Sequence, residues 1–161
     1  MQTPNNLELP YRPGVGIMIL NNQKQVLVGK RIDKLNAWQM PQGGIDEGES
    51  PKKAAMRELL EEIGTNNVEF IAESKEWFYY NVPKYLIPKL WNGQYKGQKQ
   101  KWFLCKFLGQ DSEITLDTEH PEFIEWQWVE LSELPPIIVP FKQKLYYKII
   151  KEFQNKIYNL I

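Results

Sequence analysis

The sequence predicts a single α+β domain in which strands outnumber two main helices. Its 161 residues match the usual size of one domain. Short β-branched or alternating runs, which are typical of strands, recur from Val15 to Val129, whereas helical spacing is sustained in two segments. Those segments do not alternate regularly with the strands. An α+β or α/β/α arrangement is therefore favoured over a repeated strand–helix–strand series.

The first expected element is a β-hairpin formed by Val15–Leu20 and Gln25–Lys30, with the polar segment Asn21–Lys24 between them. The first strand is apolar and rich in β-branched residues, and the second alternates in polarity. A short strand over Ala37–Met40 is expected next, and it ends at a proline. Gln42–Gly44 follows, and its two glycines predict a loop.

The first helix has clear signals at both ends. Ser50 can cap the free amides, Pro51 suits the first helical position, and Gly64 is the expected stop. An apolar stripe lies between these ends, at Ala54, Ala55, Leu59 and Ile63.

The second half of the chain predicts further strands and a final helix. Val68–Tyr80 is interpreted as one long strand or two broken ones, and Pro83–Gly97, with its prolines and glycines, as a loop. Lys101–Leu108 and Phe123–Val129 are expected strands. Helical spacing then runs from Phe141 to about Leu160.

Composition excludes several classes of protein. Apolar residues make up 42% and charged residues 25%, as in ordinary globular proteins. Twenty basic and twenty acidic residues cancel, which argues against a general DNA or RNA coat. No apolar run approaches the ~20 residues of a membrane span. The start, Met1–Asn6, lacks the pattern of a signal peptide, and residues 1–8 are expected to be flexible.

The chain has one cysteine and one histidine. A lone cysteine cannot form an internal disulfide, which suits a reducing compartment, so a cytoplasmic protein is expected. Cys105 lies in an apolar run and is interpreted as a buried strand residue. His120 cannot build a histidine-rich zinc site and is expected to be a solvated loop residue.

Three glutamates on the first helix, Glu58, Glu61 and Glu62, have spacings of three and four, so they share one face. A like-charged pair about 5 Å apart costs on the order of 3 kcal/mol. Hard divalent cations such as Mg²⁺ or Mn²⁺ would reverse the sign of that interaction. A solvated acidic face is the alternative, and these three residues alone favour it.

The surrounding pattern changes that balance. Five residues separate Gly43 from Glu49, and seven more separate Glu49 from the run Arg57-Glu58-Leu59. One residue then precedes the pair Glu61-Glu62, and one more precedes Gly64. This pattern resembles the signature of the Nudix hydrolases. The usual final aliphatic residue is Thr65 here, a departure that affects a packing position. A match at so many fixed positions is highly specific.

The resemblance implies a mixed sheet sandwiched between helices and an enzyme that hydrolyses phosphoanhydride bonds with Mg²⁺, or another divalent cation such as Mn²⁺. It implies that Gly43, through its carbonyl, joins Glu58, Glu61 and Glu62 as metal ligands, and that Glu122 completes the site from a distant loop. Glu49 and Arg57 would form a structural ion pair across the loop. Gly44 and Gly64 would be structural as well.

The resemblance extends over roughly residues 9 to 155 and narrows to one subfamily, the RNA pyrophosphohydrolases with the related dinucleoside polyphosphate hydrolases, including the plant type. The segments that carry it are Tyr11–Pro13, Trp38–Asp46, Gly97–Phe103, Pro121–Phe123 with Trp126 and Trp128, and Val139–Lys142.

Substrate contacts follow from the same resemblance. Arg12 and Lys101 would bind phosphate oxygens, and Tyr80 could donate a hydrogen bond to the same phosphate chain. Phe141 would stack on a base beside Lys142. Phe141 could alternatively be only a core anchor of the last helix. The subfamily also implies substrate contacts at Gln42 and Val139.

Three functions remain open at this point. The leading hypothesis is hydrolysis of the 5′-terminal triphosphate or diphosphate of RNA to a monophosphate, which promotes RNA decay. The close alternative is cleavage of dinucleoside polyphosphates such as diadenosine tetraphosphate. A nonenzymatic RNA- or nucleotide-binding module is the third, and the retained carboxylates argue against it. Glu58, Glu61 and Glu122 are all candidates for the general base. The expected form is a monomer that binds neither DNA nor membranes.

Overall fold

A computed structural model describes residues 9–33 and 37–160 of the chain. The flexible start predicted for residues 1–8 lies outside the described residues. Within them the strands are β1 (Tyr11–Leu20), β2 (Val26–Arg31), β3 (Trp38–Gln39), β4 (Gln42–Gly44), β5 (Val68–Glu73), β6 (Phe78–Asn81), β7 (Gly97–Phe107) and β8 (Phe123–Val129). The helices are α1 (Pro51–Ile63) and α2 (Pro140–Tyr158), with short 3₁₀ turns at Lys84–Lys89, Trp91–Gly93, Asp111–Glu113, Leu131–Glu133 and Pro135–Ile137.

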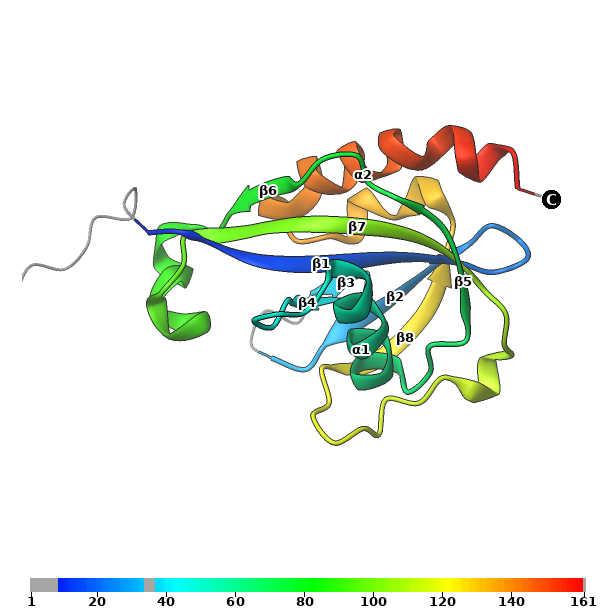
Figure 1. The fold of residues 1–161 in the computed structure, drawn as a ribbon, viewed down its shortest axis with the longest axis horizontal. Coiled ribbons are helices and arrows are strands. Elements are labelled where there is room, and N and C mark those ends of the chain that lie inside the picture. The colour runs from blue at the N-terminus through cyan, green and yellow to red at the C-terminus, as the bar shows by residue number, and fades with distance from the viewer. Residues whose placement is uncertain (1–8, 34–36, 161) are drawn as a thin grey trace, which may run out of the picture.

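The sheet is mixed, as predicted. Its main path runs β3-β2-β1-β7-β5, with β4 paired to β1, β6 to β7 and β8 to β2. The long central strands β1 and β7 are parallel, whereas the other pairings are antiparallel. The expected hairpin of β1 and β2 is present, with Leu20 opposite Val26. In Figure 1, α1 lies across one face of this sheet and α2 across the other.

Two apolar cores follow from the alternation of side chains along β1 and β7. Ile17 and Phe103 pack with Leu59 of α1 on one face. Met18 and Trp102 pack with Ile149 of α2 on the other. Burying each such aliphatic side chain stabilises the fold by roughly 1.5–3 kcal/mol. The two cores fix both helices against the sheet.

Helix α1 begins and ends where its sequence signals place it. The Ser50 side chain accepts a hydrogen bond from the Lys53 backbone N–H at 3.2 Å. Gly64 has a φ of 73°, a conformation that glycine adopts without strain, and its N–H donates to the Leu60 carbonyl. These caps fix the two ends of the helix, its apolar stripe packs against the sheet, and Glu58 and Glu62 also lie on its buried face.

Several local predictions were wrong or incomplete. Gln42–Gly44 is a strand and not a loop, because its backbone pairs with Gly14–Gly16 of β1. Val68–Tyr80 is two strands, since β5 and β6 pair with different halves of β7. Strand β7 begins at Gly97, four residues before its predicted start. The predicted loop over Pro83–Gly97 contains 3₁₀ turns.

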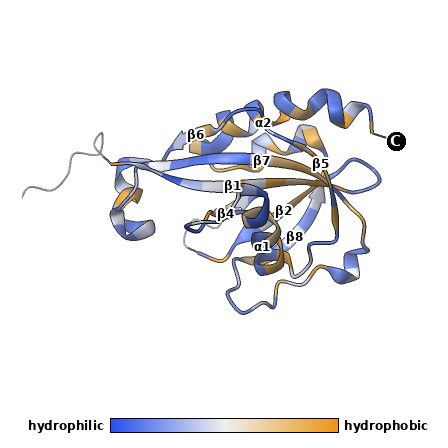
Figure 2. Cartoon of the chain, viewed as in Figure 1, coloured by the Kyte–Doolittle hydropathy of each residue, from blue (hydrophilic) through white to orange (hydrophobic). Residues whose placement is uncertain are grey.

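The sheet changes character along its length. Figure 2 shows β7 as hydrophobic toward its C-terminal end and hydrophilic toward its start. Cys105, in the hydrophobic half, is fully buried as expected, and burial raises the pKa of its thiol to about 12. A thiol with that pKa is no ready nucleophile near neutral pH.

Among the described residues, no helix has the length and apolarity that a membrane span requires.

Candidate active site

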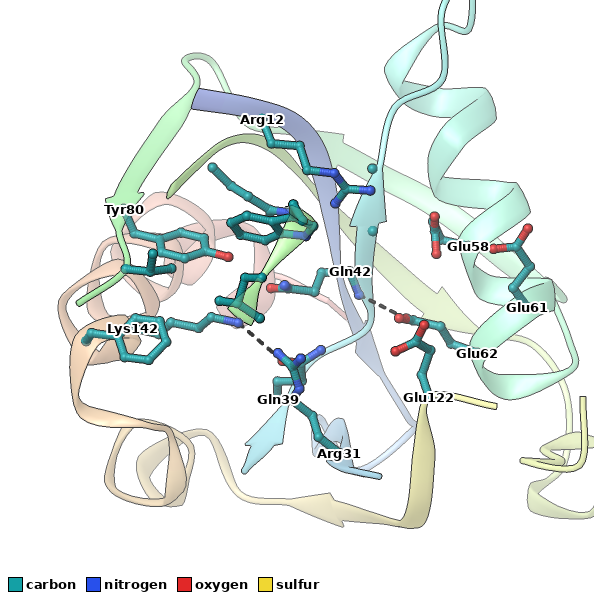
Figure 3. Close-up of a pocket in the computed structure, with 17 residues that line it drawn as sticks. Arg12, Arg31, Gln39, Gln42, Glu58, Glu61, Glu62, Tyr80, Glu122 and Lys142 are labelled. Carbon is teal, nitrogen blue, oxygen red and sulfur yellow. Dashed lines mark hydrogen bonds between the residues drawn. The ribbon is translucent and has the colours of Figure 1, made fainter. Parts of the chain in front are cut away.

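A polar cavity of about 290 Å³ opens where the hydrophilic ends of the strands meet α1 and the start of α2. Its lining residues are Arg12, Arg31, Gln39, Gln42, Gly43, Gly44, Glu58, Glu61, Glu62, Tyr80, Val82, Leu90, Trp91, Gln98, Glu122, Phe141 and Lys142. Figure 3 shows two walls: Glu58, Glu61, Glu62 and Glu122 on one side, and Tyr80 and Lys142 on the other. The cavity therefore brings an acidic wall opposite an aromatic and basic one.

Two glutamates of the acidic wall are buried. Burial raises the pKa of Glu58 to about 7, with the Glu61 charge adding to the effect and Arg57 opposing it. Burial also raises the pKa of Glu62 well above its usual value, as do the charges of Glu58 and Glu122. Glu62 accepts a hydrogen bond from the Gln42 backbone N–H at 2.9 Å. Buried carboxylates facing one cavity are costly unless a cation compensates them.

The other two acidic side chains reach the cavity from its rim. Glu61 is half exposed. Glu122, immediately before β8, has a raised pKa because it is partly removed from water, while Arg31 opposes the shift. In the described part of the chain, no three acidic, histidine or cysteine side chains stand in the arrangement of a preformed metal centre. Repulsion between like charges favours keeping these carboxylates apart.

Arg57 is the hub of the acidic segment. Its guanidinium donates to both carboxylate oxygens of Glu49 at 2.9 Å, to the Gly44 carbonyl at 2.8 Å and to Glu58 at 2.9 Å. The ion pair expected between Arg57 and Glu49 is thus present in a forked, two-bond form. The hydrogen bonds from Arg57 lower the pKa of Glu49 to about 2. This hub ties the segment after β4 to helix α1.

The residues present fit a hard divalent cation. A side chain at Gly43 would collide with the Glu58 carboxylate, with 1.9 Å between its Cβ and the carboxyl carbon, so glycine lets the strand and the helix approach. This approach brings the Gly43 backbone beside carboxylate oxygens in the cavity, a donor set that Mg²⁺ or Mn²⁺ prefers. The raised pKa values of Glu58 and Glu62 mark where positive charge would stabilise the wall.

Amide side chains form the floor between the two walls. Gln100 donates to Gln98 at 2.6 Å and to Gln42 at 3.3 Å, and it accepts from the Trp102 indole at 3.0 Å. Burial raises the pKa of Tyr80 to about 12, although Gln42 hydrogen-bonds to its side chain. The Tyr80 hydroxyl is therefore a donor at neutral pH. The predicted substrate contacts Gln42 and Tyr80 lie in one hydrogen-bonded network.

The aromatic and basic wall is built around Lys142, which is only 2% exposed. Its ammonium donates to the Gln39 side chain at 3.2 Å and lies 5.2 Å from the centre of the Tyr80 ring. Phe141 and Tyr80 rings are 6.2 Å apart. Arg31 donates to the same Gln39 oxygen at 3.3 Å. Two basic side chains and two aromatic rings therefore border one end of the cavity.

Arg12 also lines the cavity, 5.6 Å from the Trp91 ring and against Gly44 (Figure 3). Two other predicted substrate contacts do not line the cavity. Lys101 donates to the backbone carbonyls of Ser74 and Lys75, on the α1 side of β7. Val139 precedes α2, packs against the core and accepts the Lys142 backbone N–H. The strand alternation of β7 turns Lys101 away from Arg12.

Sequence reasoning missed several lining residues, and these are Arg31, Gln39, Trp91 and Gln98. Gln39 and Gln98 lie in segments that carry the subfamily resemblance, so their position in the sequence was a usable signal. Arg31 carries no such signal, because it reaches the cavity only through the pairing of β2 with β3. Trp91 lies in the segment predicted as a loop, and its φ of 47° is unusual for a bulky residue.

Replacing Lys142 with methionine is expected to stabilise the fold by a few kcal/mol at pH 7. Burial lowers the pKa of Lys142 to about 7, with the Arg31 charge adding to the shift. The unfolded chain consequently binds more protons between pH 7 and 10.5, so wild-type stability rises with pH through this window. The variant should lose that rise. Urea unfolding at pH 7 and 9.5 measures both effects.

Lys148→Met, on the exposed part of α2, is the matched control and should keep the wild-type pH slope. Equal slopes for wild type and Lys142→Met would show that Lys142 does not lose its proton in this range.

Comparison with known proteins gives concordant results. A family model described as the NUDIX domain matches residues 10–149. Proteins named RNA pyrophosphohydrolase from Rickettsia typhi and Rickettsia prowazekii are each 60% identical over 152 residues, covering 94% of both chains. Among solved structures, the E. coli dihydroneopterin triphosphate pyrophosphohydrolase matches with a TM-score of 0.68 and 19% identity, over 91% of this chain and 99% of that one. A C. elegans Ap4A hydrolase matches with a TM-score of 0.65 and 21% identity, over 89% and 98%. These two likenesses concern the fold alone.

Proposed function

This chain belongs to the NUDIX domain family, and we propose that it is an RNA pyrophosphohydrolase, which hydrolyses the 5′-terminal triphosphate or diphosphate of RNA to a 5′-monophosphate. The observation that carries the proposal is the cavity itself. Its acidic wall suits a polyphosphate held through cations, and its opposite wall offers aromatic and basic side chains to a nucleotide. Relatives about 60% identical over nearly the whole chain bear this activity in their names.

The acidic wall would hold Mg²⁺ or Mn²⁺ through Glu58, Glu61, Glu62, Glu122 and the Gly43 carbonyl. Such cations, when bound, would neutralise the polyphosphate charge and help to orient a water for in-line attack on phosphorus. Glu58, Glu61 and Glu122 are the candidates to accept the proton of that water. The hub residue Arg57 would keep Glu58 and the Gly44 backbone in place during this step.

The rest of the cavity would place the substrate. Arg12 can bind phosphate oxygens as a planar fork, and the stacked Trp91 ring restricts its orientation. Tyr80, as a neutral donor, can hydrogen-bond to the same phosphate chain. Phe141 and Lys142 would contact a nucleobase. Because these groups all come from one chain, we expect a monomer to be active.

A kinetic comparison tests the proposal. We would measure kcat/KM in Mg²⁺ on a 5′-triphosphorylated oligoribonucleotide and on diadenosine tetraphosphate, with a chelator as control. The kcat/KM for the RNA is expected to exceed that for diadenosine tetraphosphate by more than about tenfold, because the second nucleotide of the RNA adds contacts in the cavity. A preference for the dinucleotide by orders of magnitude would make a dinucleoside polyphosphate hydrolase the correct assignment. Full activity in the chelator would reject the metal site.

A further inference from the structure

Aromatic rings and lysines interleave on a surface behind the cavity. We call it the aromatic–lysine surface, and it consists of Tyr11, Trp77, Tyr79, Lys96 and Lys99. The Tyr11 and Tyr79 rings meet edge to face, with 5.0 Å between centroids. The Lys96 ammonium lies 4.7 Å from the Tyr11 centroid, and that of Lys99 lies 5.3 Å from the Trp77 centroid. The five side chains thus form one patch of rings and cations.

This surface and the cavity share the same strands. Successive side chains of a strand point to opposite faces. Arg12 of β1, Tyr80 of β6 and Gln98 of β7 line the cavity. Their immediate neighbours in the same strands, Tyr11, Tyr79 and Lys99, belong to the aromatic–lysine surface. Pairing of Tyr79 with Lys99 holds two of its members side by side. The aromatic–lysine surface is therefore the reverse side of the cavity wall.

The charge of the surface favours an anion. Among the described residues, no carboxylate forms an ion pair with Lys96 or Lys99. Lys101, whose ammonium lies 5.9 Å from the Trp77 centroid, pairs with Glu73 at 3.7 Å, so one carboxylate borders the patch along β7. Tyr79 is 54% exposed, so one face of the patch is open to a flat partner. The formal charge of the chain is zero, and this patch is locally positive against that neutral background.

We propose that the aromatic–lysine surface binds the single-stranded RNA downstream of the 5′ end. Bases would stack on Tyr79 and Trp77, and Lys96 and Lys99 would contact phosphates. Single strands are favoured because a duplex offers no free base face to a ring. The inference rests on the proposed function, and an RNA whose 5′ end occupies the cavity would have to pass from one face of these strands to the other to reach this surface.

The test uses a 12-nucleotide RNA with a 5′-hydroxyl end and a 3′ fluorescent label, which offers no phosphoanhydride bond. Fluorescence anisotropy would measure its Kd for the full chain and for Tyr79→Ala/Lys99→Gln. The double variant is expected to bind about tenfold more weakly. Tyr147→Ala/Lys148→Gln, the same changes on the exposed part of α2, is the matched control and should bind like wild type. Lys99→Gln alone should make the slope of log binding constant against log salt concentration less steep by about 0.7, the value for one lost phosphate contact with a single strand.

A kinetic arm links the surface to the substrate. The double variant should raise KM about tenfold for a triphosphorylated 12-mer and leave a triphosphorylated dinucleotide unaffected. Wild-type binding by Tyr79→Ala/Lys99→Gln, or no binding by the wild-type chain, would overturn the proposal. Tyr79→Phe keeps the ring and should bind normally, which separates loss of stacking from misfolding. Because the binding arm needs no hydrolysis, inactivity on every triphosphate would reject the proposed function alone.

Discussion

Glu61→Gln is expected to lower kcat for RNA 5′-end hydrolysis by at least about a hundredfold, because loss of even an outer partner of a metal site costs 10- to 100-fold. Glutamine keeps the shape of the side chain and removes the charge that would hold a divalent cation. Glu61 is half exposed, so the change should not disturb the core. Phosphate release at saturating RNA in Mg²⁺ measures the effect, and Mn²⁺ titration by calorimetry measures the loss of metal affinity.

The same substitution separates a metal site from a structural role. The Glu61 charge helps to raise the pKa of Glu58, so removing it relieves repulsion within the acidic wall. The thermal midpoint should therefore stay constant or rise while activity falls. Glu69→Gln, on the exposed face of β5, is the control and should change neither quantity. If both Glu61→Gln and Glu62→Gln retain full magnesium-dependent activity, the carboxylates do not hold the catalytic metal.

The parts of the site that could be predicted depend on local signals. Ser50 and Gly64 cap α1 within a few residues of the atoms they satisfy, and the spacing of Glu58 and Glu62 then follows from helix geometry. The resemblance to a known family supplied Glu122, which lies outside the signature and which local reasoning could not place. The wider resemblance thus adds a residue that reaches the cavity only in the folded chain.

What the sequence could not show depends on pairings between distant strands. Two glycines at Gly43 and Gly44 predict a loop locally, and only the partnership with β1 makes them a strand. Arg31 enters the cavity because β2 lies beside β3, and Lys101 leaves it because of its place in the alternation of β7. A shift of one residue in the start of a strand reverses which face its side chains occupy. Lys101 was therefore predicted as a substrate contact although its side chain lies on the other face of β7.

Arg57→Ala is expected to lower both stability and activity. The guanidinium holds Glu49, the Gly44 carbonyl and Glu58, and alanine leaves all three without that partner. Because Arg57 is about one third exposed, we expect a loss of about 2 kcal/mol in the free energy of unfolding and not the larger cost of a buried pair. Metal affinity and kcat should fall about 10- to 100-fold, since the segment carrying Gly43 is no longer fixed to α1. Urea unfolding and Mn²⁺ titration measure these effects.

The fall in the free energy of unfolding at acid pH shows how much of the effect of Arg57 comes from its ion pair with Glu49. Arg57 lowers the pKa of Glu49 to about 2, so this ion pair stabilises the fold above the ordinary glutamate pKa of 4.5 and loses its effect as pH falls toward 2. Arg57→Ala should flatten the fall in stability over that range. Glu49→Gln should flatten it equally, and the double variant should be no less stable than Arg57→Ala alone, because both changes remove the same ion pair. Arg57→Lys keeps the charge without the fork and should recover only part of the loss. Additive losses in the double variant would mean that Arg57 acts mainly through Glu58 and the Gly44 carbonyl, and that the ion pair with Glu49 is incidental to the site.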